Sequence, residues 1–174
     1  LAGCDTVLCL GGVQGVAALA HGHFTGHPAD IVVGPGNQYV AEAKRALFGQ
    51  IGLDLYAGPS EILVLADDSA DPGLVAAELI GQAEHGPGSP AVLITTSERL
   101  AEDVNKEIDT RLERLDRADI ARASLDDRGC IAIVDDLDQA LDLADDFAPE
   151  HLSLMVREPS SYVGRVRNAG VVFL

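Results

Sequence analysis

The 174-residue chain alternates short apolar runs with longer stretches of helical periodicity. This alternation is typical of α/β folds, in which helices cover a parallel sheet. Several runs are continuously apolar, as expected for strands that are buried on both faces. We expect strands at residues 6–10, 30–33, 54–57, 62–65, 91–95, 130–134, 152–156 and 171–174.

Helices are expected between these runs. The clearest one has Asp71 as its cap and Pro72 in its first turn, and it ends before Gly86. The expected helix from residue 97 to about 114 has apolar residues along one face and charged residues elsewhere. The charge run at 98–122 is interpreted as an exposed helix face. The expected helices are residues 13–20, 38–47, 72–85, 97 to about 114, and 138–147.

The formal charge of -16 opposes binding to a nucleic-acid backbone or to an anionic membrane surface. No apolar run is long enough to span a membrane, and no signal peptide is visible. Cys4, Cys9 and Cys130 are odd in number and widely spread, which predicts reduced thiols in a cytoplasmic protein. An anionic cofactor remains possible, because helix N-termini bind phosphates without Lys or Arg.

The acidic residues are unevenly distributed. Residues 1–59 hold only four of the 28. This predicts parts of two similar α/β units, 1–59 and 60–174, that are joined near Pro59. Both ends of the chain stop within apolar runs, so we expect a piece of a longer protein.

Two polar pairs stand at the ends of predicted elements. Gln82 and His85 are three residues apart on one helix and therefore project from the same face. They could bind one metal ion together, or His85 could simply interact with the helix dipole. Glu150 and His151 stand at the entrance of a strand. They could share acid–base chemistry or merely be solvated.

Two glycine-containing turns join predicted strands to helices, at residues 11–14 and 34–37. Such turns can bring backbone and a helix N-terminus to a cofactor's phosphate or ribose, at the carboxyl edge of a sheet. Neither is a G-x-G-x-x-G motif, and Asn37 could equally be a simple N-cap.

Two further features are open to more than one interpretation. Ser60 could be a ligand hydroxyl at the joint between the units, or it could cap its own turn. His21, His23 and His27 could form a tri-His metal site, or they could lie on a solvated loop.

Five of these segments appear in the order, and at about the spacing, that is typical of histidinol dehydrogenases. The chain therefore resembles that family over essentially its whole length. The matching segments are Gly11-Gly12-Val13-Gln14, Gly34-Pro35-Gly36-Asn37-Gln38-Tyr39-Val40, Ala57-Gly58-Pro59-Ser60-Glu61, Gln82-Ala83-Glu84-His85 and Ala148-Pro149-Glu150-His151-Leu152.

The resemblance implies a zinc- and NAD-dependent oxidation of L-histidinol through histidinal to L-histidine, with two NAD molecules used in sequence. It implies an intertwined homodimer and two incomplete Rossmann-like domains, with helices on both faces of parallel sheets. Residues 1–59 would belong to the NAD-binding domain, and 60–174 to a second domain that carries the zinc and catalytic residues.

The resemblance also assigns roles to individual residues. Glu150 and His151 match the acid–base pair: His151 would take the alcohol proton, and Glu150 would activate water on the aldehyde. Gln82 and His85 match two of the family's four zinc ligands and would thereby hold substrate as well, together with His151. Ser60 would contact the substrate, and Gln14 and Asn37 would contact NAD.

The chain departs from the family in two ways. The other zinc ligands and further substrate residues lie beyond Leu174, so we expect the isolated chain to be inactive and to bind zinc weakly. Residues 21–30 differ from the usual biosynthetic sequence and look more like a branch thought to oxidise other small hydroxylated compounds, such as sulfonated propanediols. A non-catalytic dimerisation or nucleotide-binding fragment is a further alternative.

Overall fold

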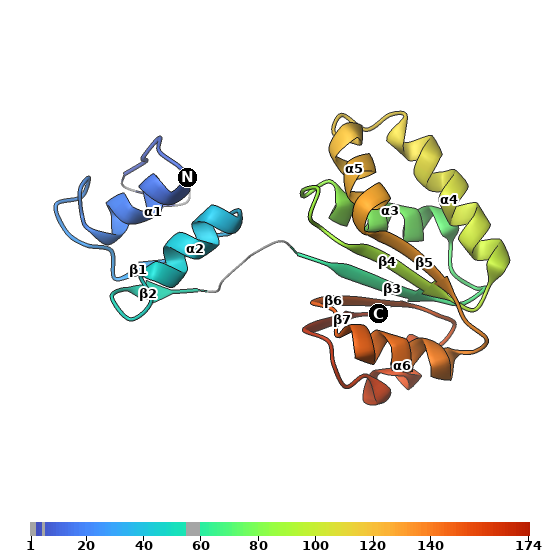
Figure 1. Cartoon of the computed structure of the whole chain (residues 1–174). Helices are drawn as coiled ribbons and strands as arrows, with labels where there is room; N and C mark the ends of the chain where they lie inside the picture. Colours follow the sequence, from blue (N-terminus) through green and yellow to red (C-terminus); the bar gives the residue numbers. More distant parts are fainter. Residues whose placement is uncertain (1–2, 5, 55–59) are drawn as a thin grey trace. The chain divides into compact units, whose positions relative to one another are not determined.

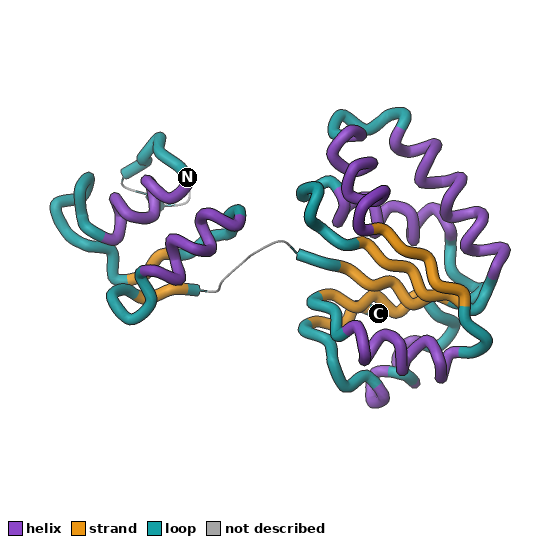
Figure 2. Tube along the Cα trace, in the orientation of Figure 1, coloured by secondary structure: helices purple, strands orange, loops and turns teal. Residues whose placement is uncertain are grey.

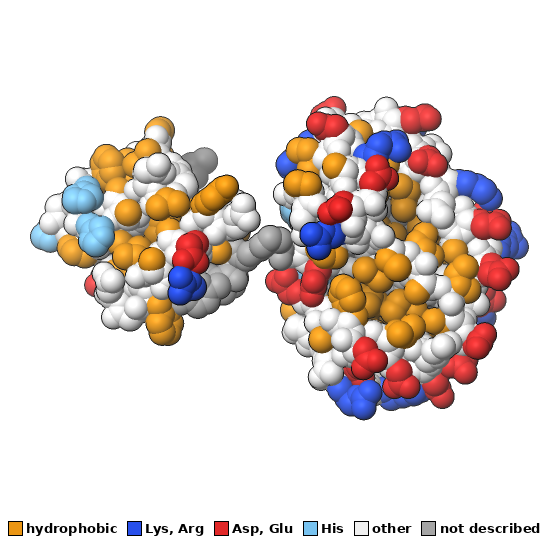
Figure 3. All heavy atoms as spheres, viewed as in Figure 1, with side chains coloured by type: hydrophobic (Ala, Val, Ile, Leu, Met, Phe, Trp, Pro, Cys, Tyr) orange, Lys and Arg blue, Asp and Glu red, His pale blue; other side chains and the backbone are white. Residues whose placement is uncertain are grey.

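The computed structural model describes residues 3–4, 6–54 and 60–174, and it divides into two compact units, Leu1–Pro59 and Ser60–Leu174. Each of the two units, drawn as ribbons in Figure 1, has its own apolar core. Acidic side chains are spread over the visible surface of the second unit, whereas histidines gather on the first (Figure 3). Among the described residues, no helix combines the length and the apolarity needed to cross a membrane.

The first unit is small and built around two helices and two short parallel strands. In chain order these are α1 (Gly12–Ala20), β1 (Ile31–Val32), α2 (Gln38–Ala46) and β2 (Gly52–Leu53). Ile31 pairs with Gly52, and Val32 pairs with Leu53. The core lies between the helices and consists of Val16, Ala20, Ala43 and Leu47.

The second unit is a five-stranded, all-parallel sheet with the order β5-β4-β3-β6-β7 (Figure 2). This is the 3-2-1-4-5 order of Rossmann folds, with the reversal between β3 and β6. Its strands are β3 (Ile62–Ala66), β4 (Ala91–Thr95), β5 (Gly129–Ile133), β6 (His151–Met155) and β7 (Val171–Phe173). Its helices are α3 (Pro72–Ala83), α4 (Glu98–Leu112), α5 (Ala118–Arg128), α6 (Leu137–Phe147) and the short 3-10 turns Pro159–Ser161 and Val163–Arg165.

Helices cover both faces of this sheet, as the continuous apolar runs predict (Figure 1). Successive side chains of a strand point to opposite faces. Val64 therefore packs with residues of α3 and α4, whereas Leu63 and Leu65 pack with residues of α6. The predicted α/β class with parallel sheets is confirmed.

One expected strand is absent, and another lies mostly outside the described residues. Residues 6–10 form no strand, and Val7 is 80% exposed. Apolar sequence alone does not make a strand; the segment has no strand partner among the residues that the structure describes. For the expected strand 54–57, Asp54 lies just after β2, and residues 55–57 lie outside the described residues.

The charge run at 98–122 is two helices rather than one exposed face. Helix α4 ends at Leu112, and α5 begins at Ala118. Leu112 and Ala121 then meet Ile80 and Ala83 of α3 in a small core of their own. The surrounding charges hide this burial in the sequence.

Helix α3 begins where the sequence predicts. The carboxylate of Asp71 accepts hydrogen bonds from the N–H groups of Gly73 (2.8 Å) and Leu74 (3.1 Å), and Pro72 occupies the first turn. The helix ends at Ala83, so Gln82 lies in its last turn and His85 lies just beyond it.

Candidate functional site

A hollow of about 570 Å³ lies between α3 and strands β3, β6 and β7, and one end of it reaches the amino edge of the second unit's sheet. Ile62 pairs with His151 at this edge, so the residues that precede β3 lie beside the start of β6. The hollow brings together four residues that the sequence singles out. They are Ser60, Gln82, His85 and His151, and they are joined there by Glu78 and Phe173.

The imidazole of His151 is held from one side by the segment before β3. Its Nδ1 lies 3.0 Å from the carbonyl oxygen of Glu61 and 3.1 Å from Oγ of Ser60. A carbonyl oxygen can only accept, so Nδ1 carries the proton and donates it. The other nitrogen, Nε2, is therefore the basic one in the neutral ring.

The basic nitrogen of His151 has a carboxylate close by. Nε2 lies 4.0 Å from Oε1 of Glu150, whose side chain is 53% exposed. The ring also stacks on Phe173, with centroids 5.9 Å apart and planes at 26°. This arrangement fixes the ring plane while it leaves Nε2 able to exchange a proton.

Gln82 is buried, and its orientation is fixed by one hydrogen bond. Its Nε2 donates to the carbonyl oxygen of Ser60 at 2.5 Å, so its Oε1 is the end of the amide that is able to bind a cation. His85, which is exposed, lines the same hollow. An amide oxygen and an imidazole suit a zinc ion, but they supply only two ligands. The described residues contain no cluster of three or more His, Cys, Asp or Glu that could hold a metal.

Glu61 and Phe173 belong to this site but are not among the residues predicted from the sequence. Oε1 of Glu61 accepts the backbone N–H of Glu150 at 3.2 Å, so the Glu61 side chain supports the segment that carries Glu150 and His151. Glu61 lies in the segment 57–61, whose resemblance to the family could have indicated that this residue belongs to the site. Phe173 reaches the site through the pairing of β6 with β7, which no local pattern shows.

The predicted NAD contacts lie in the first unit, each at the start of a helix. Asn37 is the N-cap of α2, and its Oδ1 accepts the N–H groups of Tyr39 (3.0 Å) and Val40 (3.1 Å). The cap interpretation is confirmed, and it leaves the Nδ2 amide as the group able to donate to a ligand. Gln14 is exposed in the first turn of α1.

The three histidines of the first unit do not form the tri-His metal site. All three are exposed, and only the rings of His21 and His23 are near one another, with centroids 6.0 Å apart. Among the described residues, these side chains form no group of three potential metal ligands. The solvated-loop interpretation of this segment is the correct one.

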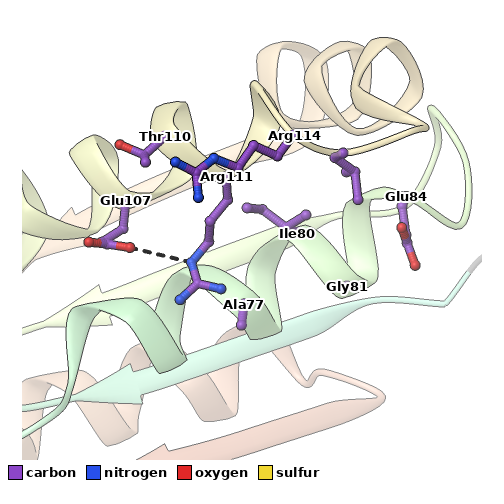
Figure 4. A pocket seen from close by; sticks show the side chains of 9 residues that line it. Ala77, Ile80, Gly81, Glu84, Glu107, Thr110, Arg111 and Arg114 are labelled. Atoms are coloured by element: carbon purple, nitrogen blue, oxygen red, sulfur yellow. Dashed lines mark hydrogen bonds and ion pairs between the residues drawn. The ribbon is translucent and has the colours of Figure 1, made fainter.

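A second hollow, of about 580 Å³, lies between α3 and the end of α4 (Figure 4). Its charged groups include a pair from one helix, with Nε of Arg111 3.4 Å from Oε2 of Glu107. It contains neither an imidazole nor a buried amide. The amino-edge hollow is therefore the better candidate for chemistry.

The fold and this site together define an α/β protein that places a carboxylate–imidazole pair, Glu150 and His151, near Gln82 and His85. The family model described as histidinol dehydrogenase matches residues 1–174. The chain belongs to the histidinol dehydrogenase family, as the five sequence segments predict.

Similar proteins agree with this assignment. A histidinol dehydrogenase of Nitrobacter winogradskyi is 50% identical over 174 residues, which are 100% of this chain and 41% of that protein. A "histidinol dehydrogenase homolog 1" of Mesorhizobium japonicum is 52% identical over 174 residues, 100% of this chain and 35% of that protein. The crystal structure of histidinol dehydrogenase from Elizabethkingia anophelis matches with a TM-score of 0.88 and 37% sequence identity. The match covers 99% of this chain and 40% of that chain. The chain thus spans about two fifths of the length of these relatives.

Proposed function

We propose that the full-length protein is a cytoplasmic, homodimeric, zinc- and NAD-dependent dehydrogenase that oxidises L-histidinol through histidinal to L-histidine. Family membership supports this activity. The observation that carries the proposal is the setting of His151, whose Nδ1 is bound to the carbonyl of Glu61 so that Nε2 is the base.

In this mechanism His151 acts first. Its Nε2 takes the proton of the substrate alcohol. NAD, when bound, would supply the hydride acceptor. The hydrogen bonds of Nδ1 to Glu61 and Ser60 hold the tautomer and stabilise the ring once it is charged. Ser60 can also contact substrate, because its side chain lines the hollow.

Glu150 acts in the second oxidation. Its carboxylate is exposed to water and lies 4.0 Å from Nε2 of His151. It takes a proton from the water that adds to the aldehyde, and it can exchange that proton with the neighbouring imidazole. Glu150 and His151 can therefore serve both oxidation steps from the same positions.

Gln82 and His85 would supply two of the zinc ligands. The bond from Gln82 to the carbonyl of Ser60 presets the amide oxygen. Zinc bound there would orient the substrate's amine and imidazole beside the acid–base pair. We propose that the isolated 174-residue chain binds zinc weakly and is inactive, because these two residues are an incomplete ligand set.

We assign the cofactor to the first unit and the chemistry to the second. Residues 1–59 would form part of the NAD-binding domain, with Gln14 and the amide nitrogen of Asn37 as contacts. Residues 60–174 would form part of the domain with the zinc and catalytic residues. The position of the Asn37 turn after β1 supports the first assignment, since α/β folds bind ligands at the carboxyl ends of their strands.

A second candidate is oxidation of another small hydroxylated compound, such as a sulfonated propanediol, by the same site. One observation favours keeping it. Relatives named "homolog" are 49% and 52% identical to this chain, and relatives named histidinol dehydrogenase are 50% and 49% identical. Overall identity therefore does not choose the substrate. A catalytically silent dimerisation or nucleotide-binding fragment is the remaining alternative.

The test is NADH formation by the full-length protein with zinc and L-histidinol, counted per substrate consumed. We expect a ratio of about two, from two successive hydride transfers. His151→Ala should lower turnover by at least about 100-fold. Glu150→Gln should move the ratio toward about one, because the first oxidation does not need the activated water.

The matched control is Glu102→Gln, which changes an exposed carboxylate on α4 and should leave turnover unchanged. Turnover of a sulfonated propanediol but not of L-histidinol would select the second candidate. A folded, zinc-loaded protein that oxidises neither compound would move the substrate to another small alcohol, whereas a folded protein that binds no zinc and oxidises neither compound would support the non-catalytic fragment.

A further inference from the structure

The first unit contains a buried lysine. Lys44, on α2, has a side chain that is only 2% exposed. Lysine is almost never so deeply buried unless it is paired. Its Nζ lies 2.6 Å from Oδ1 of Asp54 and 2.5 Å from the carbonyl oxygen of Gly34.

Asp54 completes a ring of contacts around Gly34. Its Oδ2 accepts the N–H of Gly34 at 2.7 Å, while its Oδ1 binds Lys44. Both backbone polar groups of Gly34 are therefore held, one by each member of the ion pair. We call Lys44 and Asp54 the clamp.

The clamp lies at the edge of the sheet where a ligand is expected. Gly34 follows β1 and Asp54 follows β2, so both lie beyond the carboxyl ends of two parallel strands. Gly34 also begins the turn, residues 34–37, that leads into α2 and ends at its cap Asn37.

Pro35 restricts the middle of this turn, whereas the glycines on either side of it allow more backbone freedom. Gly34 has a φ of +135°, which L side chains rarely adopt, and a side chain at Gly36 would lie 2.5 Å from that of Val40. Two glycines give the turn many alternative conformations. Fixing Gly34 at both polar groups selects one of them, and with it the position of the Asn37 amide.

We infer that Lys44 and Asp54 are positioning residues for cofactor binding, which hold the 34–37 turn in the conformation that accepts the anionic dinucleotide. The inference rests on the proposed use of NAD. Lys44 has a second effect, because it neutralises the Asp54 carboxylate, and an unpaired negative charge beside the turn would repel an anionic dinucleotide. Loss of Lys44 should therefore weaken binding more than loss of the Asp54 charge.

The test uses the full-length protein and NADH fluorescence to measure the dissociation constant. Lys44→Met should raise it at least about tenfold, because it removes two hydrogen bonds of a charged group and leaves the Asp54 carboxylate unpaired. Asp54→Asn should raise it less, because it leaves no unpaired negative charge. The kcat at saturating NAD and the KM for the alcohol should stay within about twofold, since the acid–base pair is unchanged. Hydrogen exchange at the Gly34 N–H should accelerate in both variants.

The control is Lys106→Met, the same substitution at a lysine that is 70% exposed, and it should bind NADH like the wild type. The double variant should lose no more affinity than Lys44→Met alone, because the two residues act as one unit. If circular dichroism shows that Lys44→Met does not fold, Asp54→Asn decides, since it keeps an oxygen for one of the two bonds.

The outcomes separate the inference from the function. If folded Lys44→Met binds NADH with wild-type affinity, the inference about the clamp is wrong, and the proposed function is unaffected. If Lys44→Met does not fold, wild-type affinity in Asp54→Asn has the same consequence. An unaltered exchange rate at Gly34 does the same. A wild-type protein that binds no NADH overturns the proposed cofactor, and the clamp's role in binding falls with it.

Discussion

Replacing Asp145 should reveal how the second unit fastens α6 to its edge strand. Asp145 is 5% exposed on α6, and its Oδ1 accepts the N–H groups of Arg167 (2.8 Å) and Asn168 (3.0 Å). Its Oδ2 accepts Nε of Arg167 at 2.6 Å. One carboxylate therefore ties the helix to the segment that leads into β7.

The size of the effect follows from the number of donors left without a partner. Asp145→Ala removes the acceptor of two backbone N–H groups, each worth about 1–3 kcal/mol if it stays buried. We expect a loss of about 3 kcal/mol, toward the lower part of the summed range, because water can reach the exposed Arg167. Asp145→Asn keeps one oxygen for those N–H groups and should lose about 1 kcal/mol.

The effect should also depend on pH. Burial alone would raise the pKa of Asp145, but the hydrogen bonds from Arg167 and from the two N–H groups outweigh it and hold the pKa below its ordinary value. A lowered pKa stabilises the folded state fully above about pH 4, and this stabilisation is lost as the pH falls through the folded-state pKa. The penalty of Asp145→Ala should therefore shrink toward pH 2.

The assay is urea unfolding of the 174-residue chain, followed by far-UV circular dichroism at pH 7 and near pH 2. Asp142→Asn is the control, because Asp142 also lies near Arg167 (3.5 Å) but is 78% exposed. It should change the free energy of unfolding by less than about 0.5 kcal/mol. Equal losses for Asp145→Ala and Asp142→Asn, or a penalty that does not depend on pH, would refute this account.

The remaining predictions concern the same unit and the same unfolding assay. Leu63→Ala, at a fully buried position of β3, should cost about 2–5 kcal/mol, and Leu143→Ala, at a position 40% exposed, much less; equal costs would contradict the core assignment. Ala148→Gly should stabilise by about 1 kcal/mol, because Ala148 ends α6 with a φ of +54°; destabilisation would show that this backbone is not strained. Ser124→Ala should cost about 1–3 kcal/mol, since its buried hydroxyl donates to the carbonyl of Ser89 at 2.7 Å; an unchanged midpoint would argue against that bond.

Local sequence predicts the elements that carry their own signals. The run at 62–65 becomes a buried strand, and Asp71 with Pro72 starts α3 as expected. Helix α5 is missed because its buried residues, such as Ala121, gain their partners only through tertiary contacts. The failed strand at 6–10 has the opposite cause, since apolar residues alone do not supply a neighbouring strand.

The same limit applies to the site. The sequence places Glu150 and His151 at a strand entrance, where the structure has them. The pairing of Ile62 with His151 brings the carbonyl of Glu61 to the imidazole, and that register joins residues about ninety positions apart. The hydrogen bond that orients Gln82 likewise depends on packing between α3 and the segment before β3.

The amino-edge position of the imidazole leaves the opposite edge of the sheet available for labelling. The strands between the two edges are five residues long in β3 and β6, which is a span of about 16 Å at 3.3 Å per residue. A dye on the turn between β5 and α6 would therefore lie far from Glu150 and His151. Such a reporter could follow the motions of the unit during turnover without touching the hydrogen bonds of His151.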